Sequence, residues 1–217
     1  MQIAQRAAQE IPSGSYVNLG IGLPTLVGDL IAPDREVFLH SENGILHFGP
    51  WSGEGAIDPC LINASKQPVA LYPGACIFDS ATSFMMMRGG HLDLAILGAY
   101  QVAENGDLAN WTRNDPDVPP AVGGAMELAH GAKQVWVLME HTTKDGRPRL
   151  LQRCELPLTA RSVVTRIFTD LATLRVTGAG LVVEEMVAGL TVAELQKLTL
   201  ATLREPDANI SNEGLQS

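Results

Sequence analysis

Short apolar runs alternate with segments of helical pattern along most of this chain, and this alternation limits the fold more than any other feature. Runs that are apolar throughout are typical of strands buried on both faces of a sheet, and such a sheet needs helices on both sides. We therefore predict an α/β fold with a largely parallel, helix-covered sheet. The expected strands are residues 16–19, 37–40, 69–71, 92–97 and 135–139, and the expected helices are residues 3–9, 25–31, 80–88, 125–130 and 192–203.

The sequence shows no break that would divide it into several domains. It has no internal repeat, low-complexity segment or Pro/Gly/Ser-rich linker. We predict that residues 1–204 form one domain and that the polar residues 205–217 form a flexible C-terminal tail. Within the domain, residues 171–176 and 181–186 predict a hairpin, and residues 141–162 predict a short antiparallel excursion.

Composition and charge exclude several classes of protein. The 217 residues are 46% hydrophobic and 18% charged, as expected of a globular domain with a full core. The formal net charge of -9 disfavours a nucleic-acid partner, although local cations can still hold a phosphate group. No apolar run reaches the length of a membrane span, and the N-terminal segment is amphipathic and unlike a signal peptide. We expect a cytoplasmic protein without membrane attachment.

The cysteines and histidines give no sign of a disulfide framework or a metal site. The three cysteines, Cys60, Cys76 and Cys154, are odd in number and far apart in the sequence. We expect them to be reduced thiols in buried positions, as free cysteines usually are. The five histidines have no HxxxH or CxxC neighbour, so no bound metal is expected.

A single carboxylate at the end of one predicted strand is the leading candidate for chemistry. The apolar residues 37–40 lead into Ser41-Glu42-Asn43-Gly44, and Asn and Gly both accept a positive φ. A sharp turn there would leave Glu42 at the carboxyl end of the strand, where α/β sheets bind ligands. A carboxylate in that place can be a general base, a metal ligand or a nucleophile, and the turn alone does not decide among them.

Three glycine-containing loops lie next to predicted strands. Residues 18–24 (Asn-Leu-Gly-Ile-Gly-Leu-Pro) join a strand to a helix, but lack the third glycine of the dinucleotide-binding fingerprint. Residues 88–91 (Arg-Gly-Gly-His) are best explained as a helix end capped by its histidine. Residues 121–126 (Ala-Val-Gly-Gly-Ala-Met) open a helix, and their backbone amides would suit an anion or a developing oxyanion.

Together these segments resemble the small (β) subunit of the 3-oxoacid CoA-transferases, a family that moves coenzyme A between carboxylic acids through an enzyme-bound glutamyl thioester. The resemblance covers nearly the whole chain, and the order and spacing of its motifs are more specific than any one of them. It implies a Rossmann-like CoA-transferase architecture. The motifs that carry it are residues 16–24, 41–44, 88–91, 123–126 and 157–159, with 61–66, 97–101 and 106–111 also matching.

The resemblance also implies a role for each candidate site residue. Glu42 would be the nucleophile that becomes the glutamyl-CoA thioester, and the amide of Gly124 would face the oxyanion, with the amide of Ala125 as the alternative donor. No metal and no permanently bound cofactor would be needed, because coenzyme A is itself a substrate. The residues implied to line the coenzyme A site are Asn18, Gly20, Gly22, Pro24, Asn43, Lys66, Gly123 and Ala125.

The same resemblance implies a protein partner and a class of substrate. The family's α subunit shares the active site, so we expect a heterodimer or an α2β2 assembly. Succinyl-CoA is the expected donor and a 3-oxo acid the expected acceptor. Residues 37–44, 120–124 and 166–171 resemble 3-oxoadipate enzymes, whereas residues 78–81 resemble acetoacetate enzymes, so the acceptor stays open. A dicarboxylate would need a further cation, for which Arg88 or an α-subunit residue is the candidate.

Two other functions compete with this interpretation. A sugar-phosphate isomerase on a similar scaffold would use Glu42 as a general base and the glycine loops to bind phosphate. A non-catalytic acyl-CoA-binding subunit would keep the fold and have no use for a nucleophile at Glu42. The chemistry implied by the combined motifs favours the transferase.

Overall fold

The computed structural model describes residues 2–32, 34–51, 53, 57–114, 117 and 123–205. The elements, in chain order, are α1 (Gln2–Glu10), β1 (Ser15–Leu19), the 3-10 helix η1 (Leu23–Leu30), β2 (Val37–Ser41), β3 (Ile45–Pro50), β4 (Val69–Ile77), α2 (Ser80–Arg88), β5 (Leu94–Gly98), β6 (Gln101–Ala103), β7 (Leu108–Ala109), α3 (Ala125–Gly131), β8 (Gln134–Leu138), β9 (Leu150–Leu151), β10 (Val164–Phe168), β11 (Ala172–Thr177), β12 (Gly180–Met186), α4 (Val192–Lys197) and β13 (Leu203–Arg204).

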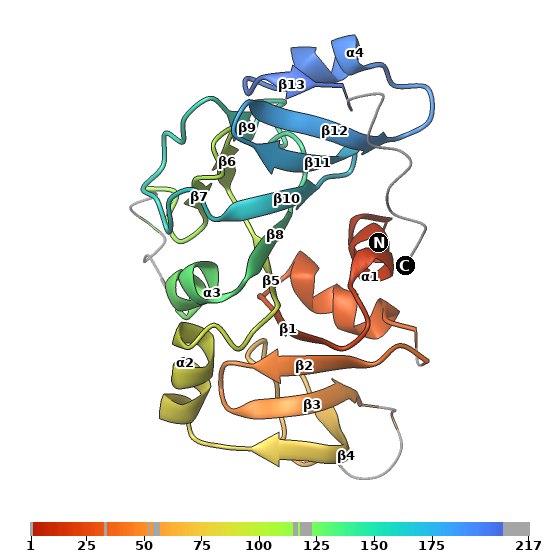
Figure 1. Ribbon diagram of the computed structural model, residues 1–217, viewed down its shortest axis with the longest axis vertical. Coiled ribbons are helices and arrows are strands. Elements are labelled where there is room, and N and C mark those ends of the chain that lie inside the picture. Colours follow the sequence, from red (N-terminus) through yellow and green to blue (C-terminus); the bar gives the residue numbers. More distant parts are fainter. Residues whose placement is uncertain are drawn as a thin grey trace.

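A large mixed sheet runs through the whole molecule (Figure 1). Its strand order is β13-β12-β11-β10-β8-β5-β1-β2-β3-β4. The central strands β10, β8, β5, β1 and β2 are parallel to their neighbours within that group. Antiparallel pairs extend the sheet on both sides, through β3 and β4 at one end and β11 and β12 at the other. The carboxyl ends of the central strands therefore meet along one edge of the sheet, as the sequence predicted.

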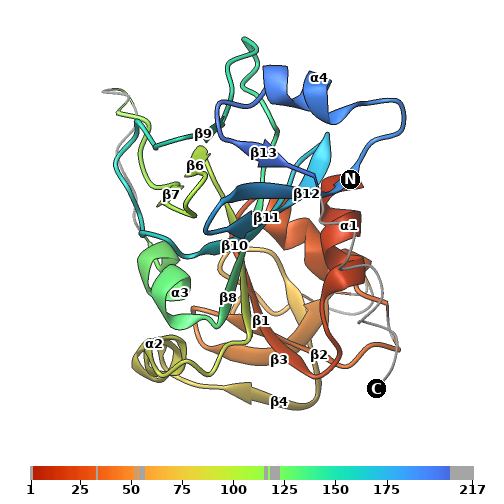
Figure 2. The same ribbon diagram turned by 45° about the horizontal axis from the view of Figure 1, so that its top comes forward.

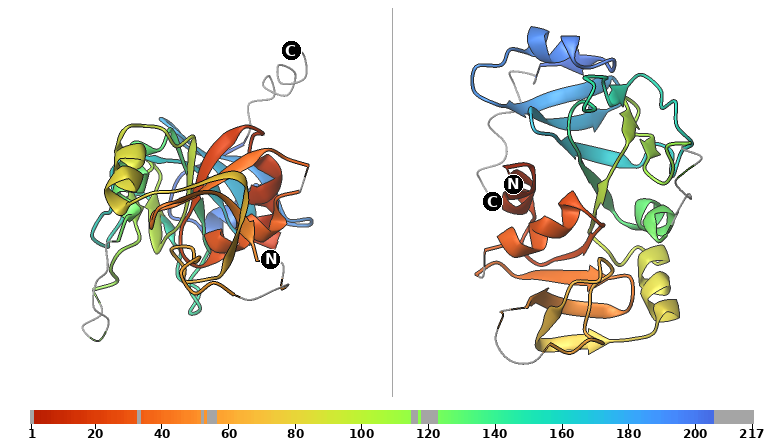
Figure 3. Two further views of the ribbon diagram at one scale, coloured as in Figure 1. Left: turned by 90° about the horizontal axis from the view of Figure 1, so that it is seen from below. Right: turned by 180° about the vertical axis from the view of Figure 1, so that it is seen from behind.

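Side chains of β5 and of most of β8 are buried on both faces, which explains why these runs are apolar. In β5, Leu94 and Ile96 pack into the core beneath α1, whereas Ala95 and Leu97 pack into the core on the other face. Figures 1 and 3 show α1 and η1 on one side of β1, β5 and β8, with α2 and α3 on the opposite side. The predicted α/β fold with a helix-covered sheet is confirmed.

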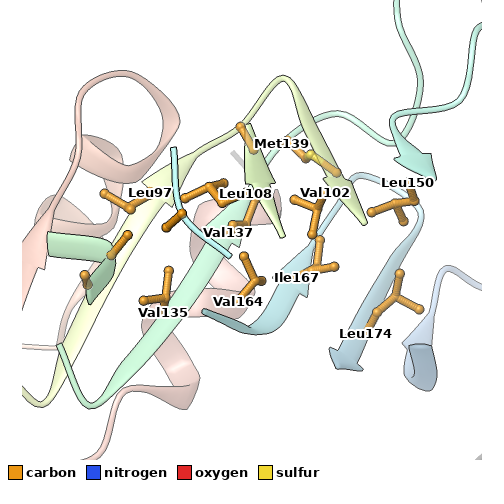
Figure 4. Close-up of a cluster of buried hydrophobic side chains, with 14 of the residues drawn as sticks. Leu97, Val102, Leu108, Val135, Val137, Met139, Leu150, Val164, Ile167 and Leu174 are labelled. Carbon is orange, nitrogen blue, oxygen red and sulfur yellow. The ribbon is translucent and has the colours of Figure 1, made fainter. Parts of the chain in front are cut away.

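A second, small sheet of β7, β6 and β9 covers the part of the large sheet that α2 and α3 leave open. It lies on the same side as α3 in every view (Figures 1 and 2). Its side chains Val102, Leu108 and Leu150 join Val137 and Ile167 of the large sheet in one buried cluster, shown in Figure 4. This sheet takes the place of a helix layer there, so the core is closed on both faces along its length.

Two predicted helices differ from the structure. Residues 23–30 form a 3-10 helix instead of an α-helix; Gly22, with a φ of 92°, precedes it, and Pro24 lies in its first turn. The last predicted helix ends at Lys197, six residues early, and a short strand β13 follows. There the side-chain amide of Gln196 donates to the carbonyls of Thr199 and Ala201, so that these two backbone groups beyond the helix end are hydrogen-bonded.

The strand predictions were right in place and incomplete in number. The predicted strands and the hairpin of β11 and β12 are present, but β3, β6, β7, β10 and β13 were not predicted. The expected antiparallel excursion is wrong in direction at its only strand, since β9 pairs in parallel with β6. Thr142 and Pro148 do form an isolated antiparallel bridge in that segment. The predicted tail lies outside the described residues, apart from residue 205.

Candidate active site

A cavity of about 460 Å³ lies along the edge where the central strands end. Its wall takes Asn18 and Gly20 from the end of β1, Glu42 from the turn after β2, and residues 97–100 from the end of β5 and the chain just after it. The start of α3 and the segment after β8 close the remaining sides. This is the position in which a parallel α/β sheet is expected to bind ligands.

Glu42 begins a tight turn between β2 and β3. Gly44 donates its N–H to the carbonyl of Ser41 over 2.9 Å and has a φ of 109°, which favours glycine. A Cβ at position 44 would overlap the carbonyl oxygen of Phe78, whose own N–H donates to Gly44 over 3.0 Å. The predicted turn is confirmed, and Gly44 is required because another chain segment passes directly against it.

The side chain of Glu42 is half-buried. Burial raises the pKa of Glu42 above its ordinary value. Within the described part of the chain, no lysine, arginine or histidine forms an ion pair with it. Burial disfavours the charged form of Glu42, and its ionised oxygen is more basic, and so more reactive toward a carbonyl carbon, than the oxygen of a carboxylate paired with a cation.

The backbone at the start of α3 lies directly against Glu42. Gly124 is the N-cap residue of α3, and a Cβ at this position would overlap Oε2 of Glu42. The preceding Gly123 has a φ of 54°, and Ala125 follows in the cavity wall. The absence of a side chain at Gly124 thus allows the main chain to approach the carboxylate more closely than any other residue would.

Asn18 enters the cavity wall from β1 and is held by a buried histidine. Its Nδ2 lies 3.0 Å from Nδ1 of His40 and 3.2 Å from the carbonyl oxygen of His40. Nε2 of His40 lies 3.0 Å from Oγ of Ser83 on α2. Burial lowers the pKa of His40 to about 4, so the ring is neutral near pH 7.

Several cavity residues were not found from the sequence. Ala99, Tyr100 and Glu140 directly follow β5 and β8, and the rule that singled out Glu42 would have found them. Arg149 also lines the cavity, and its guanidinium donates to the carbonyl oxygens of Ala99, Tyr100 and Glu140. It comes from an irregular segment, and no sequence signal places it there.

Four of the predicted site residues lie outside the cavity wall. Gly22 and Pro24 shape the start of η1 behind it. Asn43 donates its side-chain amide to the carbonyl of Ile62 over 2.7 Å and so fixes the Glu42 turn to the loop beyond β3. Lys66 is exposed on that same loop, close in sequence to Ala64 of the wall. The predicted roles of these four residues remain predictions.

The cysteines of the described residues are more exposed than the sequence predicted. Cys60 and Cys76 are exposed, so the expectation of buried thiols is wrong for both. Cys154 is half-buried, and burial raises its pKa to about 12. The described residues hold no group of three or more His, Cys, Asp or Glu side chains that could bind a metal ion. None of their helices is long and apolar enough to cross a membrane.

Comparison with known proteins identifies the family. Residues 1–198 match the family described as Coenzyme A transferase. The chain is 55% identical over 202 residues to the B subunit of 3-oxoadipate CoA-transferase from Acinetobacter baylyi, covering 93% of each chain. It is 46% identical over 199 residues to the B subunit of succinyl-CoA:3-ketoacid coenzyme A transferase from Helicobacter pylori, covering 92% of this chain and 95% of the relative.

A solved structure shows the same fold at much lower identity. The crystal structure of an acyl-CoA transferase apoenzyme from Escherichia coli O157:H7 superposes with a TM-score of 0.74 and 17% identity. The match covers 94% of this chain and only 41% of that longer chain. The likeness in sequence and fold extends over nearly all of the described residues. The chain therefore belongs to the coenzyme A transferase family and is a CoA-transferase chain of the B-subunit type.

Proposed function

We propose that this chain is the β subunit of a 3-oxoacid CoA-transferase, which moves coenzyme A from succinyl-CoA to a 3-oxo acid through a glutamyl-CoA thioester on Glu42. The observation that carries the proposal is the position of Glu42, an unpaired carboxylate of raised pKa in a cavity, in contact with the backbone of Gly124. A general base would need a proton to remove, and a nucleophile needs only an ionised oxygen and access to a carbonyl carbon.

The first half of the proposed reaction loads coenzyme A onto the enzyme. A Glu42 oxygen attacks the thioester carbonyl of succinyl-CoA. The C–S bond breaks, which releases the thiolate of coenzyme A and joins the succinyl group to Glu42 as a mixed anhydride. The thiolate then attacks the Glu42 carbonyl, the C–O bond to the succinyl group breaks, and succinate departs. Glu42 is now a thioester of coenzyme A. No net proton transfer and no electron transfer are needed, so the step requires no metal or permanently bound cofactor.

The second half transfers coenzyme A to the acceptor. The carboxylate of the 3-oxo acid attacks the Glu42 thioester. The C–S bond breaks, which releases the thiolate and forms a second mixed anhydride, now between Glu42 and the 3-oxo acid. The thiolate attacks the 3-oxoacyl carbonyl, which releases 3-oxoacyl-CoA and restores the Glu42 carboxylate. Both halves pass through tetrahedral oxyanions next to Glu42. The backbone amide of Gly124 is the proposed donor to them, with Ala125 as the alternative, and one such donor is typically worth roughly 3 kcal/mol.

The rest of the cavity suits the arm of coenzyme A. Asn18, Gly20 and Gly123 line the wall beside Glu42, and their small or amide side chains leave room for an extended thiol arm. Lys66 is exposed beyond Ala64 and is the proposed point charge for the coenzyme A phosphates. Gly22 and Pro24 contribute by holding the loop after β1 in place.

The relatives support a partner and rank the acceptors. The two B-subunit relatives are matched over 93% and 95% of their length, whereas this chain covers only 41% of the chain of the solved acyl-CoA transferase. We infer that an α subunit completes the enzyme as a heterodimer or an α2β2 assembly, acting in the cytoplasm. Identity of 55% to a 3-oxoadipate enzyme against 46% to a 3-ketoacid enzyme supports 3-oxoadipate as the proposed acceptor, with acetoacetate as the alternative.

The sequence suggested Arg88 or an α-subunit residue as the cation for a second carboxylate, and we propose a different residue of this chain in place of Arg88. Arg88 forms an ion pair with Glu127 over 2.5 Å and does not line the cavity. Arg149 lies in the wall instead, without an ion pair among the described residues, and is the better candidate within this chain.

Intact-mass spectrometry tests the proposal. The chain, co-expressed with its α subunit, is mixed with succinyl-CoA and measured before and after addition of a 3-oxo acid. We expect an adduct of coenzyme A, joined with loss of water, that forms on this chain and disappears when 3-oxoadipate is added. The Glu42→Ala complex should form no adduct. A complex that exchanges protons of a sugar phosphate and forms no adduct would support the isomerase interpretation instead.

A further inference from the structure

The side-chain amide of Asn18 is held in one orientation by groups that the proposed reaction does not use. Asn18 and His40 are direct partners in the parallel register of β1 and β2, and their side chains emerge on the same face. Ser83 lies above them on α2. All three residues are buried, with exposed fractions of 2%, 1% and 0% for Asn18, His40 and Ser83.

One backbone acceptor determines which atom donates in each hydrogen bond between Asn18, His40 and Ser83. A backbone carbonyl can only accept, so the Asn18 atom that faces the carbonyl of His40 must be the nitrogen Nδ2. The same nitrogen faces Nδ1 of His40, which must therefore be unprotonated. In the neutral ring the proton is then on Nε2, and Nε2 donates to Oγ of Ser83.

The other end of the amide is left for a ligand. Both hydrogens of Asn18 Nδ2 are used on His40, and no described group bonds to Oδ1 of Asn18. Oδ1 of Asn18 is not among the fully buried side-chain atoms without a partner in the described residues, so it keeps some exposure, and Asn18 lines the cavity. The cavity therefore presents a hydrogen-bond acceptor at this point.

We propose that His40 and Ser83 are positioning residues that fix the amide of Asn18 with its oxygen toward the cavity, so that Asn18 binds an N–H group of the pantetheine arm of coenzyme A. The chemistry of the substrates supports this choice. The ionised acids and their acyl groups offer only acceptors, whereas the pantetheine arm carries amide N–H groups. If Asn18 were free to turn its amide, its NH2 group would compete for the acyl oxygens next to Glu42.

This inference rests on the proposed function, and the kinetics of the two half-reactions test it in the complex with the α subunit. Phe in place of His40 keeps a planar ring and removes both nitrogens. We expect H40F to lower kcat/KM for succinyl-CoA about tenfold, the effect of one lost hydrogen bond. It should leave kcat/KM for the 3-oxo acid within about twofold, because coenzyme A is already attached to the enzyme when the acid binds.

Two further variants separate positioning from a loss of stability. Asn in place of His40 restores an acceptor near the Nδ1 position, so H40N should recover most of the lost kcat/KM for succinyl-CoA. The matched control is H141F, which makes the same substitution at an equally buried histidine whose partners, Thr169 and Thr199, lie outside the cavity wall. Equal losses for both substrates in H40F, or the same loss in H141F, would overturn the positioning role.

A spectroscopic test does not depend on activity. In the complex with only this chain labelled at its histidine ring nitrogens, ¹⁵N NMR at pH 7.5 should show His40 protonated at Nε2 and unprotonated at Nδ1, with the signal assigned by its loss in H40F. The opposite tautomer would contradict the fixed orientation of Asn18. The predicted tautomer in a complex that forms no coenzyme A adduct would leave the orientation standing and defeat the proposed reaction.

Discussion

His40 and His141 are equally buried histidines in different regions of the molecule. The hydrogen bonds of His40 include a residue of the cavity wall, and those of His141 do not. Burial lowers the pKa of each to about 4, and each ring contacts two side chains. His40 lies at the cavity, between the amide of Asn18 and Ser83. His141 lies behind it, in the region where β10 and α4 meet the segment after β8, between the hydroxyls of Thr169 and Thr199.

The difference lies in the partners. An amide locked to a carbonyl has a fixed polarity, so the His40 ring has one tautomer and the open atom of Asn18 is an acceptor. The threonine hydroxyls beside His141 are bound to the backbone around them: Oγ1 of Thr169 accepts from the N–H groups of Leu171 and Ala172, and neither threonine lies in the cavity wall. Both hydroxyls also have backbone acceptors of their own, in Ala172 and Leu195. A buried histidine thus serves a site only where its hydrogen bonds end at an atom that a ligand can reach.

The largest expected effect separates the cavity region from the rest of the molecule. Glu42→Gln keeps the size of the side chain and removes the nucleophilic charge, and we expect transferase activity to fall by about 10⁴-fold or more. The midpoint of thermal unfolding should stay the same or rise, because a desolvated charge is removed. Steady-state assays of the complex and calorimetry measure the two effects. A variant that kept a tenth of its activity would remove Glu42 from the chemistry.

Gly124 at the cavity and Gly178 far from it extend the comparison to the main chain. Gly124→Ala keeps the backbone N–H but places a methyl group against Oε2 of Glu42, and we expect kcat to fall by about 10²-fold because the nucleophile is displaced. Gly178, in the β11–β12 hairpin far from the cavity, has open space where a Cβ would be, so Gly178→Ala is the matched control and should leave kcat unchanged. Similar kcat values for the two variants would show that the close approach of Gly124 has no catalytic value.

The two histidines should make similar contributions to stability and differ only in function. Because burial lowers their pKa from 6.5 to about 4, the unfolded chain binds protons first as the pH falls. Each contribution is complete above pH 6.5 and is lost between pH 6.5 and 4, by about 3 kcal/mol for each histidine. Urea unfolding at several pH values should show a weaker pH dependence in H40F and in H141F than in the wild type. An unchanged dependence in either variant would mean that the histidine is charged in the folded protein.

The smallest expected effect concerns the turn beside Glu42. Asn43→Ala removes the hydrogen bond to the carbonyl of Ile62, and we expect the free energy of unfolding to fall by about 1 kcal/mol. The KM for succinyl-CoA should change by less than about twofold, because Asn43 is not part of the cavity wall. A clearly raised KM would instead assign Asn43 the contact with coenzyme A that the sequence suggested.

The sequence predicted those parts of the fold and site that depend on local pattern. Apolar runs marked the buried central strands, and Glu42 and Gly44 marked the turn, because φ preference and strand ends are local properties. β3 and β10 were missed because polar residues interrupt their apolar runs, His47 in β3 and Thr165 and Arg166 in β10. Arg149 and the role of His40 could not be predicted, since they depend on which segments the fold brings together.

The central claim is that Glu42 carries coenzyme A as a thioester, and borohydride trapping followed by peptide mapping tests it most directly. Borohydride reduces a thioester and leaves a free carboxylate untouched. In the complex treated with succinyl-CoA, we expect that Glu42 alone is converted to the alcohol, and that no reduction occurs without succinyl-CoA or after addition of excess 3-oxoadipate. Reduction at another residue, or none at Glu42 in a complex that is turning over, would contradict this claim.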